Sequence, residues 1–373
     1  MIKVLVLDTV MDRGGAEAMI MNYMRNINRE EISFDFLTNR DYHAAYEDEI
    51  ESLGGKVYHM APQLPGHFRQ YKKEMKEFLK EHPEYKIIHS NLEERSYLPL
   101  KIAKKMGVPV RISHAHNRPL GFNLKMMVRY YFRWKLKKVN THMFACGYEA
   151  GDWLYGKNNR EKVIIMNNAI DAEEYSYDES KSLDMKQKLG VEGKTVIGHV
   201  GRFFAQKNHT FLIDIFKKIH DKDPNTVLLL VGGGELDDIL MNRMKEKVRI
   251  LGLENSVQFL GVREDVADIL QAFDLFLLPS LFEGLPVTMI EAQAAGLPCV
   301  ISDKVPIQCD ITGNVKVVSL EDSTDKWAEK ILDYISEYKR FDCYQIVKKS
   351  GFDIKKNAIW LEAFYKEAME MNQ

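Results

Sequence analysis

Residues 275–302 read LFLLPSLFEGLPVTMIEAQAAGLPCVIS, and this stretch decides the fold class. Two short apolar segments, LFLLPS (275–280) and LPCVIS (297–302), flank a helical pattern that follows a Gly-Leu-Pro turn. A strand, a turn, a helix and a second strand in this order form a βαβ unit, whose strands lie parallel in one sheet. The stretch therefore predicts a parallel α/β fold.

The same alternation runs through both halves of the chain. Apolar, β-branched segments predict strands in the first half at 2–8, 33–38, 56–59, 86–89, 109–114, 142–146 and 162–166. In the second half they predict strands at 195–201, 227–233, 257–261, 275–280, 297–302 and 315–319. At 373 residues the chain exceeds what one hydrophobic core usually supports. We therefore predict two doubly wound, Rossmann-like domains.

The domain boundary is placed after residue 170. Residues 171–184, DAEEYSYDESKSLD, are acidic and poor in aliphatic side chains, so we interpret them as a linker. The first domain is then 1–170 and the second 171–352. Residues 353–373 contain apolar side chains at helical spacing up to about 370, which predicts a terminal helix that packs back towards the first domain.

The composition is ordinary for a globular protein and excludes several classes. No apolar run approaches the ~20 residues needed to cross a bilayer, and Met1 leads directly into a strand without a signal-peptide pattern. We expect a cytoplasmic protein. The four cysteines lie far apart without a CxxC spacing, which predicts reduced, packed thiols rather than a zinc site or disulfides.

The net charge of −2 conceals an imbalance, because residues 1–170 carry +7 and residues 171–373 carry −9. Within the basic half, residues 123–140 combine six Lys/Arg with aromatic side chains and no acid. This segment is open to two interpretations. It is either an amphipathic helix that lies on anionic lipid, or a domain helix with Met127, Tyr131 and Trp134 in the core and a solvated basic side. No nucleic-acid-binding motif accompanies the charge.

Two loops that follow predicted strands carry candidate binding residues. After 195–201, Arg202 and Lys207 are five residues apart on a loop that opens a helix, a combination that suits phosphate. The alternative is a solvated loop with two surface cations.

The second loop follows 275–280. Gly284 permits a tight turn, Pro286 suits the first position of a helix, and the helix N-terminus attracts anions. Glu283 and Glu291 supply acceptors for hydroxyl groups. Alternatively, Glu283 only caps the helix and Glu291 is a surface or paired carboxylate. Paired acids also suggest a glycoside hydrolase, but a phosphate-binding loop has no use in one.

Together these residues resemble the retaining GT-B glycosyltransferases of the EX7E type, glycosyltransferase family 4, which act in capsule, exopolysaccharide and glycolipid synthesis. The resemblance spans nearly the whole chain. It rests on RGGAE (13–17), VIIMNNAID (163–171), VGR (200–202) with QKN (206–208), VGGGE (231–235), FLG (259–261), and EGLP (283–286) through EAQAAGLP (291–298). One departure is MNNA (166–169), where the family often has Pro-Asn-Gly.

The resemblance implies a role for each candidate. Arg202 and Lys207 would hold the donor diphosphate, Glu283 the donor sugar, and Glu291 the ribose. Further donor-binding positions by the same resemblance are Gly14, Gly15, Gly261, Gly284, Leu285, Pro286, Val287 and Thr288.

The family has a histidine after the fifth strand of the first domain, and this chain offers two, His114 and His116. Residues i and i+2 share one face of a strand, so both could serve. We favour His116.

The function implied is transfer of a sugar, with retention, from a nucleotide-sugar donor, by family preference a UDP-sugar, to a saccharide or lipid-linked saccharide. No metal and no other cofactor is expected. A nucleotide-sugar epimerase or phosphorylase, or a non-catalytic nucleotide-sugar-binding protein, are the alternatives. The G-x-G-x-x-G spacing is absent, which argues against a nicotinamide-dependent oxidoreductase.

Overall fold

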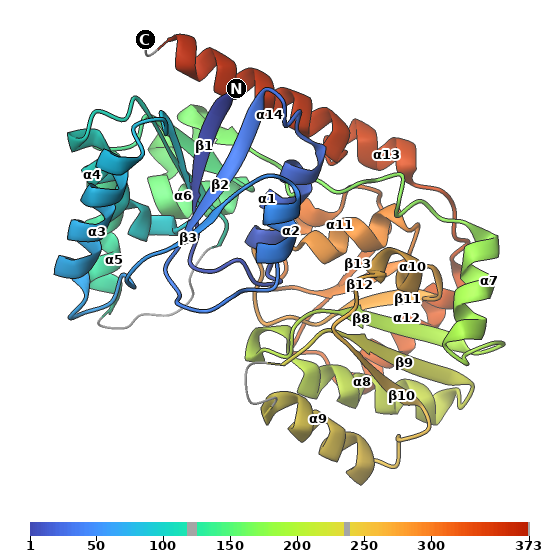
Figure 1. Cartoon of the computed structure of the whole chain (residues 1–373). Helices are drawn as coiled ribbons and strands as arrows, with labels where there is room; N and C mark the ends of the chain where they lie inside the picture. Colours follow the sequence, from blue (N-terminus) through green and yellow to red (C-terminus); the bar gives the residue numbers. More distant parts are fainter. Residues whose placement is uncertain (118–124, 235–238, 372–373) are drawn as a thin grey trace. The chain divides into compact units, whose positions relative to one another are not determined.

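The computed structural model describes residues 1–117, 125–234 and 239–371. The chain divides into two compact units, one of Met1–Ala169 with Asp353–Gln373 and one of Ile170–Phe352. Each unit contains a parallel sheet with helices on both sides (Figure 1). The prediction of two doubly wound domains is confirmed.

The first unit has a seven-stranded sheet in the order β3-β2-β1-β4-β5-β6-β7. Its strands are β1 (Ile2–Leu7), β2 (Ile32–Thr38), β3 (Val57–His59), β4 (Ile87–Ser90), β5 (Val110–Ala115), β6 (His142–Ala145) and β7 (Val163–Ile165). Its helices are α1 (Gly15–Asn26), α2 (Glu47–Ser52), α3 (Phe68–Glu81), α4 (Tyr97–Lys105), α5 (Lys125–Leu136), α6 (Tyr148–Tyr155) and α14 (Ile354–Glu370), with 3₁₀ turns η1 (Glu93–Ser96) and η2 (Lys157–Lys162).

The second unit has a six-stranded sheet in the order β10-β9-β8-β11-β12-β13. Its strands are β8 (Thr195–Val200), β9 (Thr226–Val231), β10 (Val257–Gly261), β11 (Leu275–Leu278), β12 (Cys299–Ser302) and β13 (Val315–Val318). Its helices are α7 (Glu179–Lys188), α8 (His209–Lys222), α9 (Ile239–Ile250), α10 (Val266–Gln271), α11 (Val287–Ala294), α12 (Thr324–Glu337) and α13 (Tyr344–Lys349), with 3₁₀ turns η3 (Ala205–Lys207) and η4 (Ile307–Cys309).

Helix α14 contributes to the core of the first unit, where it lies beside α1 (Figure 1). Its residues Ile354, Leu361 and Tyr365 are buried among side chains of the first sheet and of α1. Ile359, which has the same apolar character, is 67% exposed because it points away from that core. The last helix of the chain therefore completes the unit formed by the first 169 residues.

The interpretation of residues 171–184 as a linker is wrong in its second half, because α7 begins at Glu179. The Asp178 side chain accepts hydrogen bonds from the backbone N–H groups of Ser180 and Lys181, at 2.8 and 3.2 Å, and so caps the helix. Among the residues of α7 only Ser182 and Met185 are buried. So small an apolar face explains why periodicity did not reveal the helix.

The interpretation that places Met127, Tyr131 and Trp134 in the core is also wrong. Their side chains, all on α5, are 69%, 49% and 53% exposed. Residues 123 and 124 of this segment, like Glu235 of the VGGGE match, lie outside the described residues.

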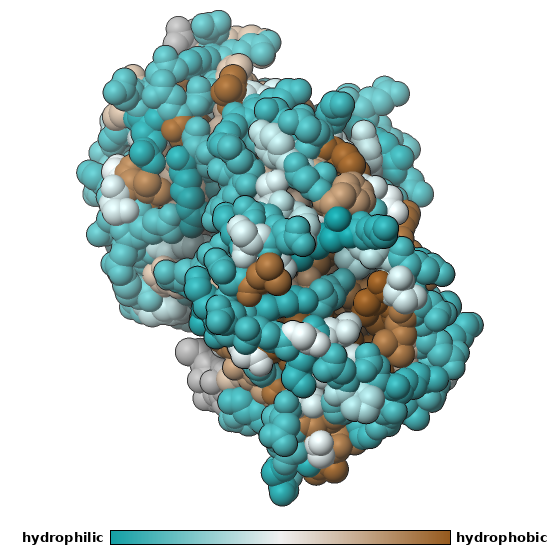
Figure 2. Space-filling view, turned by 90° about the vertical axis from the view of Figure 1, so that its right-hand side faces the viewer, coloured by the Kyte–Doolittle hydropathy of each residue, from teal (hydrophilic) through white to brown (hydrophobic). Residues whose placement is uncertain are grey.

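The surface in Figure 2 is mostly hydrophilic. On this face, hydrophobic residues form small, separate patches. All four cysteines are buried and free. Among the described residues, no helix is both long enough and apolar enough to cross a membrane.

Candidate functional site

The candidate residues of the second unit follow two neighbouring strands. Strands β8 and β11 lie side by side in the middle of the sheet, and the strand order reverses between them. In doubly wound sheets such a reversal opens a space for ligands at the carboxyl ends of the strands. Arg202 and Lys207 follow β8, and Glu283 follows β11, so the fold brings both predicted loops to this edge.

Lys207 and Glu283 form an ion pair. The Nζ atom of Lys207 lies 2.7 Å from Oε1 of Glu283, and the two side chains are only 16% and 7% exposed. The other carboxylate oxygen, Oε2, accepts a hydrogen bond of 3.0 Å from Nε2 of Gln206. Both oxygens of Glu283 are therefore bound by side chains of the loop after β8, and the residue at the N-cap position of α11 is Pro286 rather than Glu283. The alternative in which Glu283 serves as the cap is wrong.

Arg202 is exposed, and its guanidinium group lies over the ring of Phe204, with Cζ 4.4 Å from the ring centre. This cation–π contact restrains the guanidinium group, and because Arg202 is exposed, its N–H groups remain accessible to a ligand. An edge of this kind can bind two phosphate oxygens at once.

Glycine is required where the loops after β8 and β9 meet. Gly232 has φ +139°, and a Cβ atom there would collide with the carbonyl oxygen of Gly201. Its N–H donates to the carbonyl of Gly261 at 2.8 Å, which joins the end of β10 to the same edge. The predicted donor-binding residue Gly261 thus lies beside the loop that carries Arg202.

Helix α11 begins at Val287, one residue later than predicted, and the loop before it and its first turn contain two buried hydroxyl groups. The Oγ1 atom of Thr288 and the Oγ atom of Ser280 are buried and have no hydrogen-bond partner among the described residues. The predicted residues Gly284, Leu285, Val287 and Thr288 all belong to this turn or to the loop before it. The first N–H groups of a helix have no partner within the helix and attract anions.

Glu291 lies one turn into α11 and is half-buried. Burial is the main reason that the pKa of its carboxyl group is raised to about 7; a hydrogen bond from Tyr175 lowers the pKa, and the charge of Glu174 adds to the rise. The hydroxyl of Tyr175 donates to Oε1 across 3.2 Å. Near neutral pH the group is therefore divided between its charged and neutral forms.

In the first unit, the loop after β1 carries the predicted glycines. Gly14 caps α1 and Gly15 begins it, and a Cβ atom on Gly15 would meet nothing within 4 Å. The space beside Gly15 leaves the start of α1 accessible.

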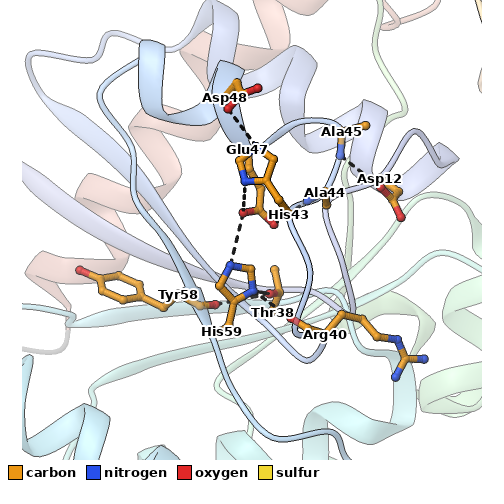
Figure 3. A network of polar contacts seen from close by, with 10 residues as sticks. All are labelled: Asp12, Thr38, Arg40, His43, Ala44, Ala45, Glu47, Asp48, Tyr58 and His59. Atoms are coloured by element: carbon orange, nitrogen blue, oxygen red, sulfur yellow. Dashed lines mark hydrogen bonds and ion pairs between the residues drawn. The ribbon is translucent and has the colours of Figure 1, made fainter.

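A network of polar contacts holds the neighbouring loop, residues 39–46, against the loop after β1 (Figure 3). Oδ1 of Asp12 accepts from the N–H of Ala45 at 3.1 Å. The buried Glu47 accepts from the N–H of Ala44 at 3.0 Å and lies 3.3 Å from ring nitrogens of His43 and His59. These contacts hold residues 39–46 in place beside the loop after β1.

The two candidate histidines lie on one side of β5, with ring centres 4.1 Å apart. His114 is fully buried, and its Nδ1 lies 3.1 Å from Nε2 of His89, whose other nitrogen bonds to the hydroxyl of Tyr365 in α14. His116 lies just beyond the strand, and its Nε2 lies 3.1 Å from Oδ1 of Asn91. Burial lowers the pKa of His116 to about 4, so its imidazole is neutral at physiological pH. His116 is 7% exposed and its Nε2 is engaged by Asn91, whereas Nε2 of the fully buried His114 has no hydrogen-bond partner among the described residues. The preference for His116 therefore stays a prediction.

Glu93 and Asp8 are two acids of this region that the sequence did not reveal. Oε1 of Glu93 accepts hydrogen bonds from the backbone N–H groups of His116 and Asn117, at 2.8 and 3.0 Å. Glu93 has φ +52°, a conformation that is uncommon for a residue with a side chain. Burial raises the pKa of its carboxyl group to about 8.

Asp8 belongs to the same chain of contacts, because its Oδ2 accepts from Asn91 at 3.3 Å, and burial raises its pKa well above the usual value. Asp8, Asn91 and His116 follow β1, β4 and β5, which are neighbours in the sheet. The rule that ligands gather at the carboxyl ends of strands applies equally here and could have found Asp8 and Asn91.

Comparison with known proteins identifies the family of the chain. Residues 181–349 match the family model described as glycosyl transferases group 1. A Bacillus subtilis (strain 168) protein named "Putative glycosyltransferase EpsF" is 34% identical over 356 residues, which cover 93% of this chain and 92% of the relative. The chain belongs to the group 1 glycosyltransferases.

A second relative of this glycosyltransferase is the Escherichia coli "UDP-Gal:alpha-D-GlcNAc-diphosphoundecaprenol alpha-1,3-galactosyltransferase". It is 30% identical over 229 residues, or 59% of this chain and 58% of the relative. Among solved structures, Anabaena HepE in complex with UDP-glucose superimposes with a TM-score of 0.74 at 21% sequence identity. The superposition covers 100% of this chain and 98% of the HepE chain. The fold is of the GT-B type.

The segment that matches the family model lies within the second unit of this glycosyltransferase and contains Arg202, Lys207, Glu283 and Glu291. His114, His116 and Gly15 lie outside it, in the first unit.

Proposed function

We propose that this glycosyltransferase moves a hexose, with retention of its anomeric configuration, from a UDP-sugar to a saccharide or a lipid-linked saccharide in surface polysaccharide or glycolipid synthesis. The observation that carries the proposal is the buried ion pair of Lys207 with Glu283 at the strand-order reversal. A cation and an acceptor held in contact suit a ligand in which a phosphate is joined to a sugar.

The diphosphate is the leaving group. When the bond between the anomeric carbon and the phosphate oxygen breaks, the electron pair stays on the phosphate, whose charge Arg202, Lys207 and the first N–H groups of α11 stabilise. We propose that no metal ion is needed, because these groups supply positive potential at the phosphate.

The acceptor attacks on the face that the phosphate leaves. The acceptor hydroxyl oxygen bonds to the anomeric carbon, and its proton passes to a leaving phosphate oxygen, so no covalent glycosyl-enzyme forms. His116, which is neutral, would exchange a hydrogen bond with a sugar hydroxyl rather than supply a charge. The UDP-sugar and the lipid-linked acceptor are supported by the E. coli relative, whose name gives both and an alpha linkage.

The test measures release of UDP from a panel of UDP-hexoses with and without lipid-linked acceptors. A transferase releases UDP mainly when an acceptor is present and forms a glycosylated product, visible by mass spectrometry. An epimerase converts the donor without acceptor, a phosphorylase requires inorganic phosphate, and a binding protein does neither.

Substitutions of Lys207 and Glu283 test whether these residues form the donor site. We expect Lys207→Ala and Glu283→Ala each to lower transfer by at least about tenfold, roughly 1.4 kcal/mol of barrier. Lys326→Ala, in an exposed ion pair with Asp322, removes a similar charge elsewhere and should leave transfer unchanged. Transfer within about twofold of wild type in both site variants would reject the assignment.

A further inference from the structure

Helix α5 turns a hydrophobic and aromatic face towards solvent. Met127, Tyr131 and Trp134 are four and three residues apart and therefore share one side of the helix. Val128 and Tyr130, beside them, are 54% and 48% exposed. An exposed cluster of this kind is unusual on a helix that packs against a domain, whose apolar side normally faces the core.

The opposite side of α5 is firmly packed. Met126 and Leu136 are 5% and 0% exposed. Arg129 forms an ion pair with the buried Glu94, with Nε 2.6 Å from Oε1. Helix α5 is therefore packed on the domain through this side, and its apolar face is exposed although the helix is anchored.

Lysine side chains lie over the exposed rings. The Nζ atom of Lys135 lies 4.3 Å from the ring centre of Trp134 and 5.6 Å from that of Tyr131. The Nζ atom of Lys138 lies 4.6 Å from the same Trp134 ring. The cations and the rings therefore form one surface.

No acid interrupts this surface along α4 and α5. The sequence from Arg95 to Cys146 contains twelve Lys/Arg and no Asp/Glu. Helix α4 packs beside α5 (Figure 1) and adds exposed Lys101 and Lys105. On α3, which packs against α4, Glu77 lies 3.9 Å from Lys73, its partner on the same helix.

We propose that the outward face of α5, with the lysines of α4, docks on an anionic phospholipid surface. Met127, Tyr131 and Trp134 enter the headgroup region, and Lys135 and Lys138 contact lipid phosphates. A second copy of this chain is a poor occupant, because two such faces would bring like charges together. Nucleic acid would use the lysines but leave the aliphatic Met127 and Val128 without a role.

The test uses the whole chain and sedimentation with vesicles of phosphatidylglycerol and phosphatidylcholine, compared with vesicles of phosphatidylcholine alone. We expect partition into the anionic vesicles to be at least about tenfold stronger. Lys135→Ala with Lys138→Ala should reduce it by about tenfold or more. Lys348→Ala with Lys349→Ala, on exposed positions of α13, removes the same charge and should have little effect.

A second measurement detects insertion of the rings. Brominated anionic lipid should quench tryptophan fluorescence in the wild type and much less in Trp134→Phe. Tyr131→Ala with Trp134→Ala should weaken binding, whereas Ile239→Ala with Ile250→Ala, two exposed positions of α9, should not. An unchanged urea-denaturation transition in every variant shows that the fold persists.

Equal binding to the two kinds of vesicle, no binding to either, or equal loss in the control variants would overturn the proposal. A dimer that Trp134→Ala dissociates, without vesicle binding by the wild type, would assign the face to a second copy instead. The proposal does not depend on the chemistry of the transfer.

Discussion

The carboxyl group of Glu93 holds the backbone of His116, whose N–H donates to Oε1 across 2.8 Å. The N–H of Asn117 donates to the same oxygen at 3.0 Å. Glu93 therefore positions the end of β5, where the candidate histidine lies, although it need not touch a substrate itself.

We expect Glu93→Ala to lower the free energy of unfolding by about 1–3 kcal/mol, because it leaves two N–H groups without their acceptor. Glu93→Gln retains a carbonyl oxygen in that place and should cost less. Urea denaturation measures both, and Glu149→Ala, on an exposed position of α6, is the matched control. Equal losses for the alanine and glutamine variants would contradict the positioning role.

The raised pKa of Glu93 gives a second prediction, which concerns pH. The carboxyl group ionises near pH 4.5 in the unfolded chain but only near pH 8 in the folded one. Between these values the folded state binds one more proton than the unfolded state. The free energy of unfolding should therefore fall as pH rises, by up to about 1.4 kcal/mol per pH unit.

Other groups titrate in the same range, so the comparison is between the wild type and Glu93→Gln. The difference in their free energies of unfolding should change steadily from pH 5 to pH 8 and level off above it. Parallel curves for the two proteins would show that the carboxyl group ionises normally in the fold.

Lys207 and Glu283 should be coupled in stability. Because the pair is largely buried, removal of one partner leaves the other charge poorly solvated, and we expect Lys207→Met and Glu283→Gln each to destabilise the fold. The double variant should recover part of the loss, with a coupling energy of about 0.5–3 kcal/mol. The same cycle on the exposed pair of Lys326 and Asp322 should give a coupling near the ~0.5 kcal/mol of surface pairs.

The strands and the sites differ in how far the sequence predicts them. Each predicted strand range overlaps a strand of the structure, because buried parallel strands form uninterrupted apolar segments that stand out locally. The sequence also placed Lys207 and Glu283 on loops that follow two predicted strands, and the family resemblance assigned both residues to one donor. Their direct ion pair was not predicted, because it depends on side-chain conformations.

Long-range contacts account for what the sequence did not reveal. The bond from His116 to Glu93 joins residues 23 positions apart on loops of adjacent strands, and nothing in the local pattern marks it. The outward face of α5 has a similar cause. Its periodicity fits a packed helix equally well, and only the position of Met126, Arg129 and Leu136 against the domain decides which side is exposed.

Gly232 should tolerate no larger residue. Gly232→Ala places a Cβ atom against the carbonyl of Gly201 and keeps a positive φ, so we expect a loss of at least about 2 kcal/mol in the free energy of unfolding. Gly252→Ala also has a positive φ, +66°, but meets no atom within 4 Å, and should cost only about 1 kcal/mol. If urea denaturation gave similar losses of unfolding free energy for the two variants, the close contact between Gly232 and the carbonyl of Gly201 would not be the cause of the destabilisation.

Glu291 should make nucleotide binding depend on pH. In the role that the family resemblance implies, the ionised carboxylate would accept hydrogen bonds from ribose hydroxyls, and with a pKa of about 7 that form is scarce at pH 6 and abundant at pH 8. The affinity for UDP should rise with pH by up to about tenfold over this interval, in proportion to the ionised fraction. Titration calorimetry at both pH values measures it. Glu291→Gln should bind UDP weakly at both, whereas Glu337→Gln, on an exposed position of α12, should retain the wild-type dependence. An unchanged pH dependence in Glu291→Gln would remove Glu291 from the ribose site.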